Sequence, residues 1–395
     1  MLPYFKYIYM FQPALHAAFA SLDTPFYYYD LSLLHRTLKR YTSCLKKYGY
    51  HAHYALKANA EDRILEAMKQ AGLGADCVSG NEVALALKSG FSPNKIVFAG
   101  VGKSDREINT ALAGSIFSFN CESIPEIERI NELAGVMNKT ANISLRINPD
   151  IDAHTHKYIS TGRAQDKFGI SPWMFGAVWE AIQRAPHIKL IGLHFHIGSQ
   201  ITDLAVFKTL CARAHTLQKW FTDKGAVLPV MNLGGGLGVD YHDPFTHPIA
   251  DFDAYFALIS QNLKPFPDQQ IHFEPGRSLV AQSGFLISRV LYVKKGKGIK
   301  FAILDAGMND LIRPALYGAR HHIVNLSSGG RMMRYDVVGP VCESSDRFAK
   351  SVLLPEVKRG DFIALCSAGA YGQVMGMQYN RRDLAKSYYS DQLHS

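Results

Sequence analysis

Lys57 is the first residue whose type and setting suggest chemistry. It follows a β-type run from His51 to Leu56 within the motif YALKAN (residues 54–59), and a helix is predicted over 61–71. A lysine at the end of a strand is ordinarily a solvated end-cap. The alternative is a buried amine, with its pKa lowered by desolvation, that forms a Schiff base with a carbonyl cofactor. Only agreement among distant stretches can favour the second interpretation.

A glycine run and a charged pair are suited to such a cofactor. Gly234, Gly235 and Gly236 follow an apolar run, and backbone without side chains lets N–H groups converge on an anion. The alternative for this run is a flexible turn. Glu274 and Arg277 would contribute only about 0–1 kcal/mol as a surface ion pair. In a site, the carboxylate could keep a pyridine nitrogen protonated while the guanidinium meets a phosphate.

Two histidines, His194 and His196, share one face of a β-type run because side chains alternate along a strand. A metal pair is conceivable, but no third ligand stands at a convincing spacing, so the sequence predicts no metal. An imidazole stacked on a flat cofactor fits His196 better, with Ser199 near the cofactor phosphate. His194 is equally compatible with a buried structural role.

Three stretches nearer the C-terminus carry groups suited to a substrate. Cys342 and Glu343 stand together between β-type runs. A lone cysteine is usually filler, and a role as proton donor requires it to reach another part of the site. Arg313 and Tyr317 in RPALYGA, and Tyr371 in GAYG, add a cation and phenols that suit a carboxylate or a phosphate. In isolation each of them would be assigned to structure.

The elements that must position these groups alternate between β-type runs and helices, after a strand over 25–29 and a helix over 31–48. Eight βα steps across about 225 residues predict a (β/α)8 TIM barrel. An open doubly wound sheet is the competing architecture, but its glycine run would sit at the first turn rather than the seventh. In a barrel the carboxyl ends of all strands converge on one face. The runs centre near His53, Asp76, Val97, Phe117, Leu145, Leu193, Asn232 and Phe273.

After Arg277 the sequence pattern changes to short strands separated by Gly, Pro and Ser turns. The sequence therefore predicts an α/β chain with a barrel over 31–277 and a β-rich domain made of 1–30 and 278–395. That domain is expected to contribute to the active site and to a dimer interface. The tail from Arg381 is expected to be helical or loose. Strands are expected over 284–294, 301–305, 336–339 and 361–367.

Composition argues against several classes of protein. The 395 residues are 47% hydrophobic, and the net charge of +9 comes from lysines and arginines that never form a run of five. This scatter argues against nucleic-acid binding and favours small anionic ligands. Six cysteines without a CxxC motif predict reduced thiols in the cytoplasm. Residues 1–20 are interpreted as folded chain rather than a signal peptide, and no stretch is apolar enough to span a bilayer.

Ten ordered motifs between about Thr24 and Asn380 together resemble the diaminopimelate decarboxylase family, pyridoxal-phosphate enzymes with an alanine racemase-like barrel (fold type III). The segment 152–169 particularly separates the chain from ornithine and arginine decarboxylases. After Asn380 the family commonly continues with Ser-Arg-Pro-Arg-Pro, whereas this chain continues differently from Arg381, a departure expected to touch no predicted catalytic group. The motifs are YALKAN, DCVSGNE, RINPDIDAHTHKYISTG, KFGI, GLHFHIGSQ, NLGGGLG, EPGRSLVAQSG, RPALYGA, GPVCESSD and GAYG.

The resemblance implies a role for each candidate residue. Lys57 would form the Schiff base with pyridoxal 5'-phosphate (PLP), His196 would stack on its ring, and Glu274 would bind its pyridine nitrogen. Cys342 would be the proton donor, supplied by the partner subunit of a head-to-tail homodimer with shared active sites. Glu343 would recognise the distal amino group of the substrate. Cofactor contacts would come from Ser199, Gly235, Gly236, Gly276, Arg277 and Tyr371. Further substrate contacts would come from Arg277, Arg313, Tyr317 and Tyr371, with Arg277 assigned mainly to the substrate.

The implied activity is decarboxylation of meso-2,6-diaminopimelate to L-lysine and carbon dioxide, the last step of lysine biosynthesis. The alternatives are another basic amino-acid or carboxynorspermidine decarboxylase on the same fold, a racemase, and a catalytically silent regulator. The presence of Lys57, Glu274 and Cys342 argues against the last. Neither nucleic acid nor membrane is expected as a partner, and the segment 152–167 is interpreted as a lid loop.

Overall fold

The computed structural model describes residues 13–152, 162 and 165–393. Residues 1–12, predicted to be folded, and most of the lid predicted over 152–167 lie outside the described residues. By its contacts the chain divides into two compact units. The barrel unit comprises residues 38–238 and 251–276, and the β-rich unit comprises residues 1–37, 239–250 and 277–395.

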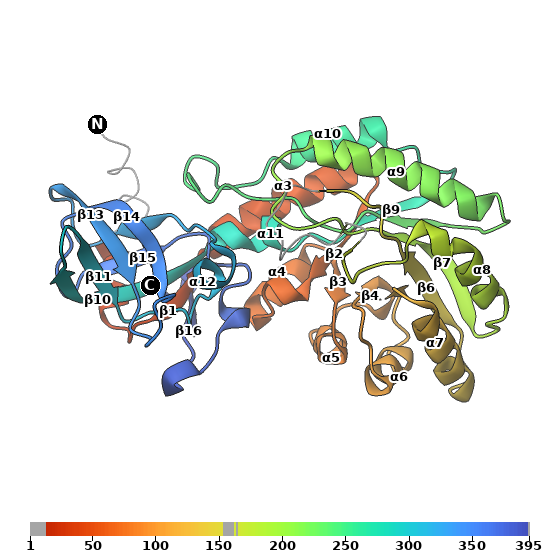
Figure 1. Cartoon of the computed structure of the whole chain (residues 1–395), viewed down its shortest axis with the longest axis horizontal. Helices are drawn as coiled ribbons and strands as arrows, with labels where there is room; N and C mark the ends of the chain where they lie inside the picture. Colours follow the sequence, from red (N-terminus) through yellow and green to blue (C-terminus); the bar gives the residue numbers. More distant parts are fainter. Residues whose placement is uncertain (1–12, 153–161, 163–164, 394–395) are drawn as a thin grey trace. The chain divides into compact units, whose positions relative to one another are not determined.

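The barrel unit contains a closed barrel of eight parallel strands, which confirms the predicted (β/α)8 architecture. Strands β2 and β9 close the barrel, with His51 paired to His272. Figure 1 shows the helices α4 to α10 outside the strands. The strands are β2 (His51–Ala55), β3 (Gly74–Cys77), β4 (Ile96–Phe98), β5 (Ser118–Cys121), β6 (Ala141–Arg146), β7 (Ile188–His194), β8 (Val230–Asn232) and β9 (Gln270–Phe273). The helices are α4 (Asp62–Gln70), α5 (Gly80–Lys88), α6 (Asp105–Ala113), α7 (Ile124–Val136), α8 (Phe175–Gln183), α9 (Ala205–Thr222) and α10 (Phe252–Asn262).

Local sequence accounts for where these elements begin and end. The strands are short apolar runs that are buried along most of their length, as expected for a parallel sheet covered by helices. Helix α5 begins after Ser79, whose side chain accepts a hydrogen bond from the Glu82 backbone N–H, and Ser123 caps α7 in the same way. Such side chains satisfy backbone donors that have no partner within the helix.

The turn that carries Lys57 differs in detail from the prediction. Strand β2 ends at Ala55, and Leu56–Ala58 form one 3-10 turn, so Lys57 lies just beyond the strand rather than at its end. Helix α4 then begins and ends one residue inside the predicted range of 61–71. Helix α3 (Leu31–Tyr48), which precedes the barrel strands, has the predicted bounds.

Eight strands form the sheet of the β-rich unit, in the order β12-β15-β10-β11-β13-β14, with β1 paired to both β10 and β16. Figure 1 shows β1, near the red end of the chain, among the blue C-terminal strands. Helix α2 (Pro13–Ala20) contributes Phe19 to a buried core that also holds Phe26, Phe285 and Phe362. The strands are β1 (Phe26–Tyr29), β10 (Gly284–Lys295), β11 (Lys300–Leu304), β12 (Ile323–Asn325), β13 (Met332–Val338), β14 (Arg347–Pro355), β15 (Phe362–Leu365) and β16 (Lys386–Tyr389).

Three strands of this unit lie where no strand is predicted. In β14, buried, half-buried and exposed residues follow one another without a regular alternation, so the period-2 pattern that identifies a strand is missing. β12 has only three residues. β16 lies in the tail predicted to be helical or loose, and that prediction is wrong there because β16 pairs with β1 from the other end of the chain. Helix α13 (Ser390–Leu393) follows it.

The structure also bears on membrane-spanning helices, cysteine pairing and metal sites. No helix among the described residues is long and apolar enough to cross a membrane. All six cysteines are free thiols, and only Cys342 is exposed. Within the described part of the chain, no three His, Cys, Asp or Glu side chains are grouped so that they could hold a metal ion.

A pair of buried histidines lies inside the barrel unit. His53 and His272 are 3% and 4% exposed, and the His53 Nε2 atom lies 2.8 Å from the His272 Nδ1 atom. The His53 Nδ1 atom lies 2.9 Å from the Lys95 carbonyl oxygen, which can only accept a hydrogen bond. In the neutral state His53 therefore donates from Nδ1, and its Nε2 atom can only accept. Burial lowers the pKa of both residues, that of His272 to about 2.

We expect acid to destabilise the barrel unit. Below pH 6.5 the unfolded chain takes up a proton that the folded chain, with the pKa of His272 at about 2, does not. Stability is therefore fully present above that pH and falls as the pH drops. One such histidine accounts for a loss of about 2 kcal/mol between pH 7 and pH 5. Urea unfolding followed at both pH values measures this loss.

The variant His272→Asn tests the source of this acid sensitivity. Asparagine keeps a hydrogen-bond donor near the position of Nδ1 but does not titrate, so we expect a clearly smaller loss between the two pH values. His35→Asn changes an exposed histidine of α3 and serves as the control. If His272→Asn loses as much stability between pH 7 and pH 5 as the wild type does, the histidine pair is not the source of the acid sensitivity.

Candidate active site

Lys57 lies at the carboxyl-terminal face of the barrel. Its Nζ atom is 3.3 Å from the Oδ2 atom of Asp76, and its side chain is 34% exposed whereas that of Asp76 is fully buried. The amine is thus accessible to a ligand, rather than enclosed as the Schiff-base hypothesis assumes. Burial raises the pKa of Asp76, Glu274 raises it further, and the nearby Lys57 amine opposes both effects. The Ala55 N–H donates to the Pro275 carbonyl, which ties the Lys57 turn to the loop after β9.

Glu274, immediately after β9, is a carboxylate held by several donors at this face. Its Oε1 atom accepts hydrogen bonds from Asn120 Nδ2 on β5 (3.1 Å) and Asn232 Nδ2 on β8 (2.8 Å). Its Oε2 atom lies 2.7 Å from His194 Nε2 on β7. All four side chains are buried. Three strands and the end of a fourth therefore hold one carboxylate in one orientation.

Electrostatic interactions link the Glu274 carboxylate to the Lys57 amine and to two histidines. Burial alone would raise the pKa of Glu274, but His194, and less strongly Lys57 and His196, bring it below its usual value. Burial lowers the pKa of His196, and the charge of Lys57 lowers it further, so this imidazole is neutral. Such interactions act over short distances in a poorly hydrated interior. The Lys57 amine is therefore close enough for its charge to act on both Glu274 and His196.

The glycine run packs tightly against this site. The Gly235 N–H donates to His196 Nδ1 at 3.2 Å, and a Cβ atom at Gly235 would collide with the Glu274 carbonyl. Gly234 has a φ of +69°, which strongly favours glycine. Ile201 N–H donates to the Gly236 carbonyl at 2.9 Å, so the loop that carries Ser199 lies beside the run.

This set of groups fits the predicted cofactor. Two buried polar atoms of the site, Asp76 Oδ1 and His194 Nδ1, have no hydrogen-bond partner among the described residues, and such atoms usually mark the place of a ligand or water. Lys57 supplies an amine for an aldehyde, His196 a neutral ring, and Glu274 a carboxylate for a pyridine nitrogen. The N–H groups of Gly234 and Gly235 already donate to Asn232 Oδ1 and His196 Nδ1, which leaves the Gly236 N–H of this run for a phosphate.

Two buried arginines form a second cluster within the β-rich unit. Arg277 Nη1 donates to the hydroxyl of Tyr241 at 2.7 Å, and its guanidinium carbon lies 4.8 Å from the centre of the Tyr371 ring. Arg313, the first residue of α12 (Arg313–Tyr317), places its guanidinium carbon 4.9 Å from the centre of the Tyr241 ring. Burial raises the pKa of Tyr241, but the two guanidiniums outweigh it and lower the pKa overall.

A neutral histidine orients Arg313. His321 Nδ1 lies 2.8 Å from the Cys366 carbonyl oxygen and must donate to it, so its Nε2 atom accepts from Arg313 Nη1 at 3.0 Å. Burial and the charge of Arg313 lower the pKa of His321 to about 3, which keeps it an acceptor at neutral pH. The Nε atom of Arg313 has no hydrogen-bond acceptor among the described residues. An anionic ligand would supply the missing counter-charge.

The predicted site residues thus fall into three groups, one in the barrel unit and two in the β-rich unit. The barrel unit brings together Lys57, Ser199, His196, Gly235, Gly236 and Glu274, followed by Gly276. The β-rich unit brings Arg277, Arg313 and Tyr371 together, with the half-buried Tyr317 at the end of α12. Cys342 and Glu343 form a third, exposed group on the loop between β13 and β14.

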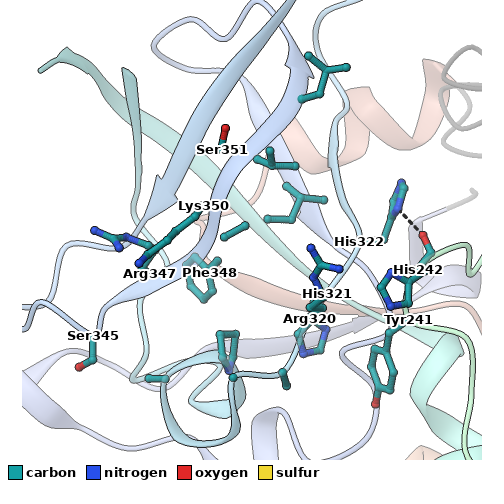
Figure 2. A pocket seen from close by; sticks show the side chains of 18 of the residues that line it. Tyr241, His242, Arg320, His321, His322, Ser345, Arg347, Phe348, Lys350 and Ser351 are labelled. Carbon is teal, nitrogen blue, oxygen red and sulfur yellow. Dashed lines mark hydrogen bonds between the residues drawn. The ribbon is translucent and has the colours of Figure 1, made fainter. Parts of the chain in front are cut away.

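A hollow of about 710 Å³ in the β-rich unit is lined by none of the predicted site residues. Figure 2 shows the basic side chains Arg320, Arg347 and Lys350 on its wall and the hydroxyl of Tyr241 directed away from Arg347 and Lys350. The ring of Tyr241 lines the hollow while its hydroxyl meets Arg277. Neither Arg277 nor Arg313 lines the hollow, but Tyr241 and His321, which contact them, do.

Sequence reasoning missed five residues that shape these clusters. Asn120 and Asn232 bear a weak signal, since each is a buried amide near the carboxyl end of a barrel strand. His194 stands beside a recognised candidate but is compatible with a purely structural role. Tyr241 and His321 carry no local signal, because their importance comes only from the arginines they contact.

Comparison with known families gives the class of protein. Residues 31–281 match the family described as pyridoxal-dependent decarboxylase, pyridoxal binding domain. This match covers the whole barrel and ends just after the Glu274–Arg277 segment. The chain thus belongs to the PLP-dependent decarboxylases.

Curated relatives narrow the assignment. Diaminopimelate decarboxylase of Bacteroides thetaiotaomicron is 54% identical over 95% of this chain and 97% of its own length, and that of Zymomonas mobilis is 42% identical over 92% and 87%. The crystal structure of diaminopimelate decarboxylase from Helicobacter pylori complexed with L-lysine has a TM-score of 0.88 at 40% identity, covering 94% of this chain and 93% of that chain. The chain belongs to the diaminopimelate decarboxylase family, which confirms the resemblance seen in its motifs.

We expect Lys57 to be the residue that binds PLP covalently. Reduction of the cofactor-loaded protein with borohydride should add the mass of one reduced pyridoxyl phosphate to the wild type and none to Lys57→Ala. The reason is that only an amine can form the reducible bond with the cofactor aldehyde. Intact-protein mass spectrometry measures the difference.

Lys69→Ala is the control, because Lys69 is a partly exposed lysine on α4 paired with Glu66. It should be labelled like the wild type. Stoichiometric labelling of Lys57→Ala at another lysine would refute the assignment.

Proposed function

We propose that this protein decarboxylates meso-2,6-diaminopimelate to L-lysine and carbon dioxide, the last step of lysine biosynthesis, with PLP as its cofactor. The observation that carries this proposal is the buried carboxylate of Glu274, held in the barrel unit by three donors; within the β-rich unit, the two buried arginines add cations suited to a carboxylate. Diaminopimelate carries a second carboxylate at its distal end, which ornithine lacks. Relatives of the same name at 54% and 42% identity support the proposal.

The barrel residues would hold the cofactor. PLP, when bound, withdraws electrons from the substrate carbon that loses its carboxylate. Lys57 would anchor it and release it to the substrate amine, and His196 would support its ring. Glu274, already oriented by three donors, would keep the pyridine nitrogen protonated because a charge-assisted hydrogen bond favours that form. The remaining cofactor contacts would come from Ser199, Gly235, Gly236, Gly276, Arg277 and Tyr371.

The β-rich unit would bind the substrate. Arg277 and Arg313 are buried cations held by phenol rings and a neutral imidazole, and a guanidinium binds a carboxylate through two parallel hydrogen bonds. Tyr317 and Tyr371 would add phenol hydroxyls. The ammonium at the distal end of the substrate would meet the carboxylate of Glu343.

Cys342 would return a proton to the carbon after carbon dioxide leaves. It is exposed, unlike the other five cysteines, and a thiol is a suitable general acid when placed within hydrogen-bond reach. In our proposal it acts across a homodimer, so that Cys342 and Glu343 complete the site of the partner subunit. The domains would be the barrel over 31–277 and a β-rich domain of 1–30 and 278–395. Six free thiols fit a cytoplasmic location.

Product analysis tests the proposed reaction. The protein loaded with PLP should convert meso-2,6-diaminopimelate to L-lysine with release of one carbon dioxide. Ornithine, arginine and carboxynorspermidine should react far more slowly, because each lacks the distal amino-acid carboxylate that the arginines would hold. A preference for ornithine would assign the chain to another decarboxylase, and racemisation with retention of both carboxylates would assign it to a racemase.

We expect Arg313→Gln to raise the KM for diaminopimelate by about 10- to 100-fold, the loss of one charge-assisted hydrogen bond at about 1.5–3 kcal/mol. PLP binding, followed by its absorption, should remain because the barrel residues are unchanged. Arg320→Gln, at an exposed arginine seven residues further along the chain, is the matched control. An unchanged KM in Arg313→Gln would remove this residue from the substrate site.

A further inference from the structure

The loop that carries Cys342 and Glu343 is held from within by a buried carboxylate. Asp346 is 4% exposed, and its two oxygens accept hydrogen bonds from the backbone N–H groups of Val341 (2.6 Å) and Met308 (2.7 Å). A side chain at Gly339 would collide with this carboxylate. The base of the loop is therefore fixed, while Cys342 and Glu343 at its tip are exposed.

Two consecutive residues from the C-terminal segment contact this exposed tip. The Asn380 side-chain oxygen accepts a hydrogen bond from the Cys342 backbone N–H at 3.1 Å. The Tyr379 hydroxyl donates to the Oε1 atom of Glu343 at 2.6 Å. Neighbouring residues of one segment thus bind neighbouring residues of the other. The contacts lie immediately before Arg381, where the chain departs from its family pattern.

The segment that makes these contacts has an unusual backbone. Asn380 and Arg381 have φ values of +54° and +55°, a left-handed conformation that asparagine tolerates but arginine rarely adopts. The segment is tied down on both sides, because Met377 N–H donates to the Asn309 carbonyl and Arg382 Nη2 donates to the Asp305 carbonyl. Strand β16 then begins at Lys386 and pairs with β1. Backbone of this kind persists only where the surrounding structure holds it.

The two contacts would act on different properties of the tip. The bond from Asn380 fixes the backbone at Cys342 and so limits where the thiol can lie. The bond from Tyr379 stops rotation of an exposed carboxylate and leaves its other oxygen, Oε2, to meet a ligand. The carboxylate raises the pKa of the Tyr379 phenol, so the hydroxyl keeps its proton and remains the donor.

We propose that Tyr379 and Asn380 are positioning residues for the reaction, Asn380 by placing the proton donor Cys342 and Tyr379 by orienting Glu343 toward the distal ammonium of the substrate. This inference rests on the proposed function. Neither residue need touch the substrate. The separate partners predict separate kinetic effects, since a misplaced proton donor slows turnover whereas a misoriented carboxylate weakens recognition.

Tyr379→Phe removes one hydroxyl and should raise the KM for diaminopimelate about fivefold to tenfold while kcat changes less than about twofold, the size expected for one hydrogen bond to a charged group at an exposed site. Tyr292→Phe is the matched control, because Tyr292 is an exposed tyrosine of the same unit that packs against Arg359. An unchanged KM in Tyr379→Phe, or an equal rise in Tyr292→Phe, would overturn the role of Tyr379.

Two substitutions at Asn380 separate the hydrogen bond from the backbone conformation. Asn380→Gly keeps the left-handed backbone available but removes the acceptor, and should lower kcat about tenfold with little change in KM. Asn380→Asp keeps both the hydrogen-bond acceptor and the left-handed backbone, and should retain most of the wild-type activity. Wild-type kcat in the glycine variant, or an equal loss in both variants, would overturn the role of Asn380.

A second measurement does not depend on turnover. Because the other five cysteines are buried, the rate at which folded protein reacts with a thiol reagent reports on Cys342 alone. Asn380→Gly should change this rate more than about twofold, and Tyr292→Phe should not. A variant that fails to fold would expose all six thiols, and the number of thiols that react would identify it. The inference would then be decided by Asn380→Asp and Tyr379→Phe.

The outcomes distinguish this inference from the proposed function. A wild-type protein that releases no carbon dioxide from diaminopimelate would refute the proposed reaction itself. A wild type that forms L-lysine, together with Tyr379→Phe and Asn380→Gly variants that keep wild-type KM, kcat and thiol reactivity, would refute only the positioning role.

Discussion

The candidate active site depends on one buried carboxylate. A carboxylate removed from water is stable only where donors replace the lost hydration. Glu274 finds them on Asn120, His194 and Asn232, which come from three different strands. These donors meet only when the barrel is closed with its strands in register. The same closure brings Lys57 close enough for its charge to act on Glu274, so folding and the assembly of the site are a single event.

The β-rich unit faces the opposite problem, because it buries cations. Arg277 and Arg313 contact aromatic faces, and a phenol and a neutral imidazole accept hydrogen bonds from them. For Arg313, a full ion pair within the cluster would satisfy the guanidinium but leave it nothing with which to bind an acid. A neutral partner orients the guanidinium while its charge remains available. This choice of partner suits a site that must recognise a carboxylate and later release the product.

Most of the fold could be predicted because its signals are local. Each barrel strand is a short apolar run followed by a helix, and eight such steps define the barrel whatever their contacts. The missed strands show the limit of this reasoning. β14 lacks alternation, and β16 is ordered by a partner at the far end of the chain. The exact position of Lys57 escapes prediction too, since a single 3-10 turn leaves no periodic signal.

The sequence by itself determined the family, the barrel, and the identity of Lys57, Glu274 and the arginines as candidates, because ordered motifs and apolar periodicity belong to contiguous residues. Only the tertiary structure decided which residues serve them. Glu274 is held by residues 80 and 154 positions earlier, Arg313 by a histidine without any motif, and Cys342 by an asparagine 38 positions later. A hydrogen bond requires atoms about 3 Å apart, and proximity of that kind between distant residues exists only after the chain has folded.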